Sequence, residues 1–318
     1  MKKAILLVLV ALGFCLVLAV AGAWFYGGSY EINVLLRHGG TYWRSVKTDD
    51  SALSPSMRLA LEKSPPATPG HVNWRWIDLG FEVGDLPVMV DGAEVDRILL
   101  ARIDPTRYRF AVYNDSTGSR SLDQWMAALN AVLVINGSYY GRDGRPVTPV
   151  LSAGTLLGPK AYDARAGAFV AADGFAEIRN LDGGDWRQAF LGADNAMVSF
   201  PLLFDRSRPV PAIADSRWLA NRSFVAKDWR GRIVLGTTAD AFFSLARLSA
   251  FLQLAPLGLR VALNLDGGPV ACQGIQIDGF DRRVYGKWEL QAEGDAARLL
   301  AWPYGTVAMP IVLAVLPK

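Results

Sequence analysis

The stretch LVINGSYY places polar side chains directly after an apolar run and is a first candidate for chemistry. The run ends at Asn136 and is followed by Gly137, Ser138, Tyr139 and Tyr140. Polar groups at the ends of strands, where loops converge, are a common place for ligands. A glycine without a Cβ lets backbone N–H groups face a phosphate or a sugar hydroxyl. The other interpretation is an ordinary strand followed by a glycine turn.

The stretch LNLDGG repeats this design further along the chain, where Asp266 follows an apolar run and precedes Gly267 and Gly268. A carboxylate so close to a buried strand is costly to desolvate unless it is paired or bound. Asp266 is therefore a candidate acid or base. The alternative is a purely structural role, in which its carboxylate accepts hydrogen bonds from backbone N–H groups within the turn. A third candidate is Arg222 in NRSFVA, because arginine can hold two phosphate oxygens at once, although it could also be a surface arginine.

The composition excludes several classes of site. Only two histidines occur, His38 and His71, so a Ser-His-Asp triad or a histidine-rich metal site cannot form downstream of them. Cys15 and Cys272 show no metal-binding spacing, and their different surroundings make a disulfide between them unexpected. The net charge of +3, with scattered arginines, indicates no nucleic-acid partner. Catalysis must use Asp, Glu, Asn, Arg, Tyr or Ser, and we expect neither a cofactor nor a metal.

The N-terminus has the pattern of a targeting segment. Lys2 and Lys3 precede an apolar run from Ala4 to about Phe25, which suits a signal peptide or a single membrane anchor. We favour the anchor, which would place the rest of the chain on the exported side of a membrane. The sequence thus predicts a signal or anchor over residues 1–25, a proline-rich linker over 26–73 and one globular domain over 74–318.

Within the linker, Tyr30–Leu36 fits a strand and Pro55–Lys63 a short helix. Between Asp96 and Asp115 we expect two strands around an Asp-Pro turn, followed by a helix with Ser121 as its N-cap.

Apolar strands are expected over 131–136, 232–236, 260–266 and 309–317, with a hairpin at Asp173-Gly174. A helix capped by Thr238 or Asp240 joins the second and third of these strands. The fold class is α+β, with mixed β-sheets and a few packed helices.

Taken together and in order, these motifs make the chain resemble the phosphodiester glycosidase family between about residues 97 and 317. The resemblance is carried by ARIDPTRYRFAVY, LVINGSYYGRDGRP, NRSFVAKDWRGRIVLGTT, ALNLDGGP and MPIVLAVLP. The family removes a sugar from a sugar-1-phosphodiester, and its fold is α+β. The resemblance implies that Asn136, Arg222 and Asp266 line the pocket and that Gly137, Gly267 and Gly268 shape it.

The sequence departs from the family pattern at five positions. Ser138 replaces a glycine, Ser223 and Ala226 replace Thr and Gly, and Pro269 and Val270 replace a Gly-Ser pair. We expect a hydrolase acting on an exported or exopolysaccharide glycan, with Asp266 as acid, base or charge stabiliser.

Two other functions stay open. One is a glycan-binding envelope protein that keeps the pocket without the chemistry, and the other is a metal-dependent hydrolase. Asp143, Asp194 and Asp228 are the candidates for a second carboxylate.

Overall fold

The computed structural model describes residues 3, 12–21, 43–63, 65–162, 166–182, 184–301 and 307–318. Residues 12–21 are helical, whereas most of the predicted targeting segment and the strand expected at Tyr30–Leu36 lie outside the described residues. Among the described residues, no helix is both long enough and apolar enough to cross a membrane.

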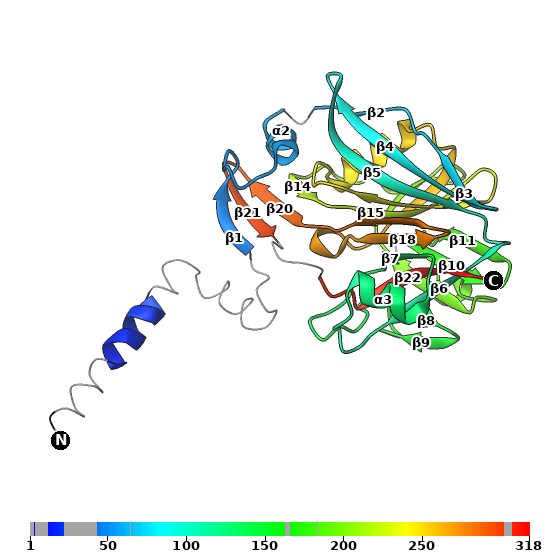
Figure 1. The fold of residues 1–318 in the computed structure, drawn as a ribbon, viewed down its shortest axis with the longest axis horizontal. Helices are drawn as coiled ribbons and strands as arrows, with labels where there is room; N and C mark the ends of the chain where they lie inside the picture. Colours follow the sequence, from blue (N-terminus) through cyan, green and yellow to red (C-terminus); the bar gives the residue numbers. More distant parts are fainter. Residues whose placement is uncertain are drawn as a thin grey trace.

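A large eight-stranded sheet forms the central layer (Figure 1). Its strands in spatial order are β13 (Leu202–Asp205), β17 (Leu259–Asn264), β15 (Ser223–Asp228), β16 (Ile233–Thr238), β5 (Ala93–Ile103), β4 (Phe81–Val90) and β2 (Thr68–Pro69), with β3 (Arg75–Asp78) pairing with β4. Successive side chains of β5 enter opposite cores, Leu99 and Ala101 on one face and Ile98 and Leu100 on the other. The large sheet is therefore buried on both faces.

Three smaller sheets surround the central layer. The C-terminal sheet contains β19 (Phe280–Val284), β18 (Gln273–Ile277), β7 (Leu133–Asn136), β22 (Ile311–Pro317) and β6 (Tyr108–Asn114). The hairpin sheet contains β11 (Phe175–Asn180), β10 (Gly167–Ala172), β12 (Asn195–Ser199), β8 (Val150–Ser152) and β9 (Thr155–Leu157). The edge sheet contains β1 (Trp43–Lys47), β21 (Ala296–Ala301), β20 (Trp288–Glu293) and β14 (Trp218–Ala220).

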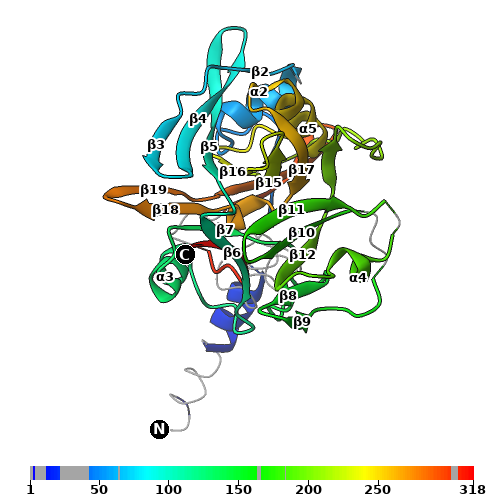
Figure 2. The ribbon, with the colours of Figure 1, turned by 90° about the vertical axis from the view of Figure 1, so that its right-hand side faces the viewer.

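Short helices cover the outer faces of this framework (Figure 2). They are α2 (Pro55–Lys63), α3 (Leu122–Leu129), α4 (Trp186–Ala189) and α5 (Leu245–Leu254), with a 3-10 turn η1 (Gly268–Val270). The buried side chains of α3 pack with Val134 of β7 and Val312 of β22, and those of α4 pack with the hairpin sheet. The α+β class, the Pro55–Lys63 helix and the Ser121 cap are confirmed.

Two expectations need correction. Every strand pairing in the described residues is antiparallel, so the sheets are not mixed. The strand–helix–strand order of β16, α5 and β17 does not make β16 and β17 neighbours. The strand β15 lies between them and pairs antiparallel with both. The helix α5 is capped by Ser244 rather than by Thr238 or Asp240.

Part of the expected linker also folds onto the body of the protein. The strand β1 pairs with β21, and Met57 and Ala60 of α2 are buried in the core beneath the large sheet. These apolar side chains were visible in the sequence, but the prolines around residue 65 suggested an extended segment.

Candidate active site

Asn136 and Asp266, the polar residues that follow the apolar runs of the two similar motifs, are in direct contact. Asn136 ends β7 of the C-terminal sheet, and Asp266 follows β17 of the large sheet. The Nδ2 of Asn136 donates a hydrogen bond to the backbone carbonyl of Asp266 at 2.7 Å. The backbone N–H of Asp266 donates in return to the carbonyl of Gly137 at 3.0 Å. Asn136 is buried, and its Oδ1 has no hydrogen-bond partner among the described residues. The side chain therefore clamps the Asp266 loop while keeping one acceptor unused.

Arg222 lies immediately before β15, and backbone carbonyls hold its side chain in place. Its Nε donates to the Phe243 carbonyl at 3.2 Å and its Nη2 to the Trp218 carbonyl at 2.8 Å. In the described part of the chain Nη1 has no hydrogen-bond partner. Burial lowers the pKa of Arg222, while the nearby acidic groups of Tyr139, Glu289 and Asp266 raise it. A fixed, desolvated guanidinium with a free N–H suits an anionic ligand.

Glu289 of β20 is a second carboxylate that the sequence analysis missed. Its Oε1 accepts a hydrogen bond from the indole Nε1 of Trp218 at 2.7 Å. The start of β20 is fixed to the large sheet because Asn221 Oδ1 accepts from the backbone N–H groups of Lys287 and Trp288 at 2.9 and 3.0 Å. Glu289 has no glycine motif beside it and sits within β20, which pairs with β14 on one side and β21 on the other. Nothing local in the sequence indicated that it faces the site.

The glycines after Asp266 allow this loop to approach both Arg222 and Glu289. A Cβ on Gly267 would lie 3.2 Å from Arg222 Nη1, and a Cβ on Gly268 would lie 2.7 Å from Glu289 Oε2. Gly268 also has a φ of +73°, which favours glycine. The Gly-Gly pair thus brings the loop against a cation and a carboxylate.

The pKa values of the two carboxyl groups are both raised. Burial, followed by the negative charge of Glu289, raises the pKa of Asp266 to about 8, against the opposing effects of the Gly267 N–H and Arg222. Burial also raises the pKa of Glu289, although the Trp218 hydrogen bond and Arg222 favour its ionised form. We assign the proton of the pair at neutral pH to Asp266 and the charge to Glu289. Such a split between two neighbouring carboxyl groups is the usual basis of acid and base roles.

The aromatic residues of the first motif form a wall beside this pair. The Tyr139 ring stacks on Phe200 with centroids 4.2 Å apart, and its hydroxyl donates to the Phe200 carbonyl at 2.7 Å. Burial, followed by the charge of Asp266, raises the pKa values of Tyr139 and Tyr140. Both tyrosines therefore lie within electrostatic reach of Asp266 and stay protonated at neutral pH.

Gly137 and Ser138, also predicted to touch substrate, face the protein interior. A Cβ on Gly137 would lie 2.6 Å from Ile311 Cγ2, so this glycine permits packing against β22. Ser138 is 1% exposed, and its Oγ accepts from Thr148 Oγ1 at 3.1 Å. Their positions favour structural roles behind the site.

Of the three aspartates considered as a second carboxylate, two have local structural partners and the third is exposed. Asp228 binds the backbone N–H groups of Arg230 and Arg232 in the turn after β15. Asp143 is exposed and accepts from the backbone N–H of Arg145, and Asp194 is exposed beside the hairpin sheet. Among the described residues, no group of three His, Cys, Asp or Glu side chains could hold a metal ion.

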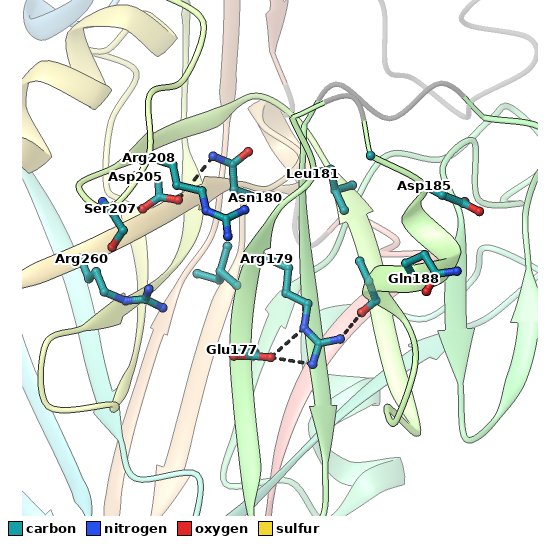
Figure 3. Close-up of a pocket in the computed structure, with 13 residues that line it drawn as sticks. Glu177, Arg179, Asn180, Leu181, Asp185, Gln188, Asp205, Ser207, Arg208 and Arg260 are labelled. Atoms are coloured by element: carbon teal, nitrogen blue, oxygen red, sulfur yellow. Dashed lines mark hydrogen bonds and ion pairs between the residues drawn. The ribbon is translucent and has the colours of Figure 1, made fainter.

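A separate hollow of about 560 Å³ lies between β11, α4 and β13 (Figure 3). Arg179 in this hollow is paired with Glu177 at 2.6 Å, and Asn180 donates to Asp205 at 3.3 Å. Arg260, near the start of β17, also lines it, whereas Asp266 follows the end of that strand, roughly 20 Å away by extended-chain geometry. The hollow contains none of the residues predicted from the sequence, so the candidate site remains the one around Asp266.

The fold and this site define an α+β protein with a partly buried pair of carboxyl groups beside a buried, fixed arginine. Residues 129–271 match the phosphodiester glycosidase family, which confirms the resemblance seen in the motifs. The match includes Asn136, Arg222 and Asp266 but ends before Glu289.

Solved structures resemble the chain in fold at low sequence identity. A hypothetical protein from Synechocystis is 16% identical with a TM-score of 0.53, over 73% of this chain and 64% of that one. The chain thus spans slightly less than two thirds of that protein. The catalytic domain of zebrafish N-acetylglucosamine-1-phosphodiester alpha-N-acetylglucosaminidase, auto-inhibited by its pro-peptide, is 12% identical with a TM-score of 0.47, over 87% of this chain and 88% of that one. A search of curated protein sequences gave no match.

Proposed function

We propose that the protein hydrolyses the glycosidic bond of a sugar-1-phosphodiester. The observation that carries this proposal is the juxtaposition of Asp266 and Glu289 beside the fixed guanidinium of Arg222. A sugar phosphodiester has one negative charge next to an acid-sensitive C1–O bond. The site supplies a cation for the charge, a protonated carboxyl group for the bond and a charged carboxylate for the developing oxocarbenium ion.

Each group has one role in this reaction. Arg222 Nη1 binds a phosphate oxygen, because the other guanidinium nitrogens are held by backbone carbonyls. Asp266 gives its proton to the oxygen between C1 and phosphorus as the C1–O bond breaks. Glu289 stabilises the positive charge at C1, and water completes the hydrolysis to a free sugar and a phosphate monoester. Asn136 holds the Asp266 loop in place through the hydrogen bond from its Nδ2 to the Asp266 carbonyl.

The experiment is an assay of the purified chain from residue 43 onward with UDP-N-acetylglucosamine, UDP-glucose and an aryl glucosyl phosphodiester. We expect free sugar, and a loss of at least about a hundredfold in Asp266→Asn and Glu289→Gln. Asp143→Asn, an exposed aspartate, is the matched control and should keep full activity. Sugar release that survives in both site variants would overturn the catalytic assignment.

A glycan-binding protein without turnover is the second candidate, and the replacement of the family's Gly-Ser pair favours it. Val270 now lies where a hydroxyl is expected, and both Pro269 and Val270 are buried in η1. The departure at Ser138 adds no support, since its hydroxyl is bound to Thr148. Binding of UDP-glucose in calorimetry without sugar release in the assay would establish this function instead.

The location of the substrate follows from the N-terminus and is also a proposal. The basic start and the apolar run to about Phe25 support export of the domain, with a membrane anchor or a cleaved signal. The substrate would then be a glycan of the cell envelope or an exopolysaccharide. Alkaline phosphatase fused after residue 318 should be active if the domain is exported, and an inactive fusion in cells that make the full-length chain would contradict export.

A further inference from the structure

Trp218 connects two groups of the candidate site and keeps part of its ring in solvent. Its backbone carbonyl accepts from Arg222 Nη2 at 2.8 Å, and its indole N–H donates to Glu289 Oε1 at 2.7 Å. At the same time 42% of the residue is exposed. A tryptophan with its polar N–H bound and a large part of its surface accessible is well suited to contact a ligand.

The strand that carries Trp218 explains this double role. In β14, Leu219 and Ala220 are buried, and the pairing with β20 sets Ala220 opposite Glu289 and Trp218 opposite Gln291. The side chain of Trp218 therefore reaches Glu289 diagonally across the two strands, a distance that long aromatic side chains can span. A tryptophan serving only to cover the core would be expected to bury its ring, as Trp125 does at 2% exposure.

We propose that Trp218 has two functions in the site: its N–H fixes the Glu289 carboxylate, and its exposed ring packs against the apolar face of the sugar. The proposal rests on the function proposed above, in which Glu289 faces C1 of the sugar. It makes Trp218 a positioning residue through the N–H and a specificity residue through the ring. The expected ligand is a pyranose whose C1 oxygen is joined to phosphate. One face of its ring has few axial hydroxyls and therefore exposes mainly C–H groups.

The N–H function is tested without turnover, by following the Glu289 carboxyl carbon with ¹³C NMR as the pH is changed. The signal is assigned by its loss in Glu289→Gln. Trp218→Phe keeps a ring but removes the N–H that stabilises the ionised form. We expect its Glu289 pKa to rise by about half to one unit. Trp229→Phe, at an exposed tryptophan in the turn after β15, is the control and should leave the titration unchanged. An unchanged titration in Trp218→Phe overturns the N–H function.

The ring function is tested with UDP-glucose, measuring KM in the assay and Kd by calorimetry. We expect Trp218→Phe to keep both within about twofold and Trp218→Leu to raise both about three- to tenfold, since leucine has bulk but no flat face. Equal values in the wild-type, phenylalanine and leucine proteins overturn the ring function. Thermal unfolding of each variant shows whether it is folded, and Trp218→Met replaces the leucine variant if that protein is not.

Failure of the proposed function is distinguishable from failure of this inference. If the wild-type protein neither binds nor cleaves UDP-glucose and UDP-N-acetylglucosamine, the proposed function and the ring function both fail. The NMR titration still decides the N–H function in that case. If the wild-type protein is active, the proposed function stands; an unchanged Glu289 titration in Trp218→Phe then overturns the N–H function, and equal KM and Kd values in the wild-type, phenylalanine and leucine proteins overturn the ring function.

Discussion

Asp266 is the residue whose protonation state decides whether the proposed reaction can occur. A buried carboxyl group beside a second carboxylate holds its proton well above the pH at which an exposed aspartate loses it. In this chain the effect raises the pKa of Asp266 to about 8, with burial as the larger cause and Glu289 as the second. The proton is therefore available for donation at neutral pH, and no histidine is needed as the acid.

We predict that kcat/KM falls as the pH rises through about 8, because the acid form of Asp266 is then lost. The sign follows from the role, since a general acid works only while it is protonated. The fall should be absent from the residual activity of Asp266→Asn, which has no proton to lose. The measurement is kcat/KM for UDP-glucose between pH 5 and 10. Wild-type activity that instead increases steadily to pH 10 would argue for Asp266 as a base.

Arg222 gives a prediction about geometry rather than charge. Lysine keeps the positive charge but cannot donate to the carbonyls of Phe243 and Trp218 while also reaching the substrate. Arg222→Lys should lower kcat/KM for UDP-glucose about tenfold to a hundredfold. Arg208→Lys, the same charge-conserving substitution at an exposed arginine away from the site, should have no effect. Full activity in Arg222→Lys would mean that only the charge matters.

The loop between β17 and η1 is the element that brings the carboxylates together. Gly268 has a positive φ, and a Cβ there would meet Glu289 Oε2 at 2.7 Å. Gly279 has a similar φ of +76° but no atom within 4 Å of its Cβ position. A comparison of substitutions at these two glycines therefore separates the effect of backbone strain from the effect of the contact with Glu289.

We expect both Gly268→Ala and Gly279→Ala to lose about 1 kcal/mol of unfolding free energy from the positive φ. Only Gly268→Ala should also lose activity, by about tenfold or more, because Glu289 must move. Urea unfolding and the UDP-glucose assay give the two quantities. If the two variants lose activity equally, the close contact with Glu289 is not important for the reaction.

Elements also show which features could be predicted from the sequence. The candidates Asn136 and Asp266 were readable, because an apolar run, a polar residue and glycines leave a local pattern, and the two do meet. The strand expected over 260–266 in fact ends at Asn264, two residues before Asp266. Glu289 was not readable. Its side chain reaches the site only because Asn221 ties the start of β20 to the large sheet, a contact between residues more than 60 positions apart. The antiparallel pairing was missed for the same reason, since β15 inserts between two strands that are consecutive around α5.

At the scale of the whole molecule, three sheets meet at the candidate site. Asn136 comes from the C-terminal sheet, Arg222 from the large sheet and Glu289 from the edge sheet. The geometry of the site therefore depends on the packing between these sheets. The same packing removes Asp266 from water, which is why its carboxyl group keeps its proton. The protonation state of Asp266 therefore affects both the stability of the fold and the proposed reaction.

This linkage predicts how stability depends on pH. The pKa of Asp266 is about 8 in the folded protein against 3.8 for an unperturbed aspartate, so the folded state binds more protons between these values. The Asp266 contribution to stability is thus fully present below about pH 4 and is lost as the pH rises toward 8. Asp266→Asn, which has no charge to bury, should be more stable than the wild-type protein at pH 8.5, by roughly 1–3 kcal/mol. The two proteins should approach each other at pH 5. Urea unfolding at both pH values gives the difference, with the exposed Asp143→Asn as the control. If the difference in unfolding free energy between Asp266→Asn and the wild-type protein is the same at pH 5 and pH 8.5, Asp266 is already ionised in the folded protein at pH 5. That result would contradict its role as an acid.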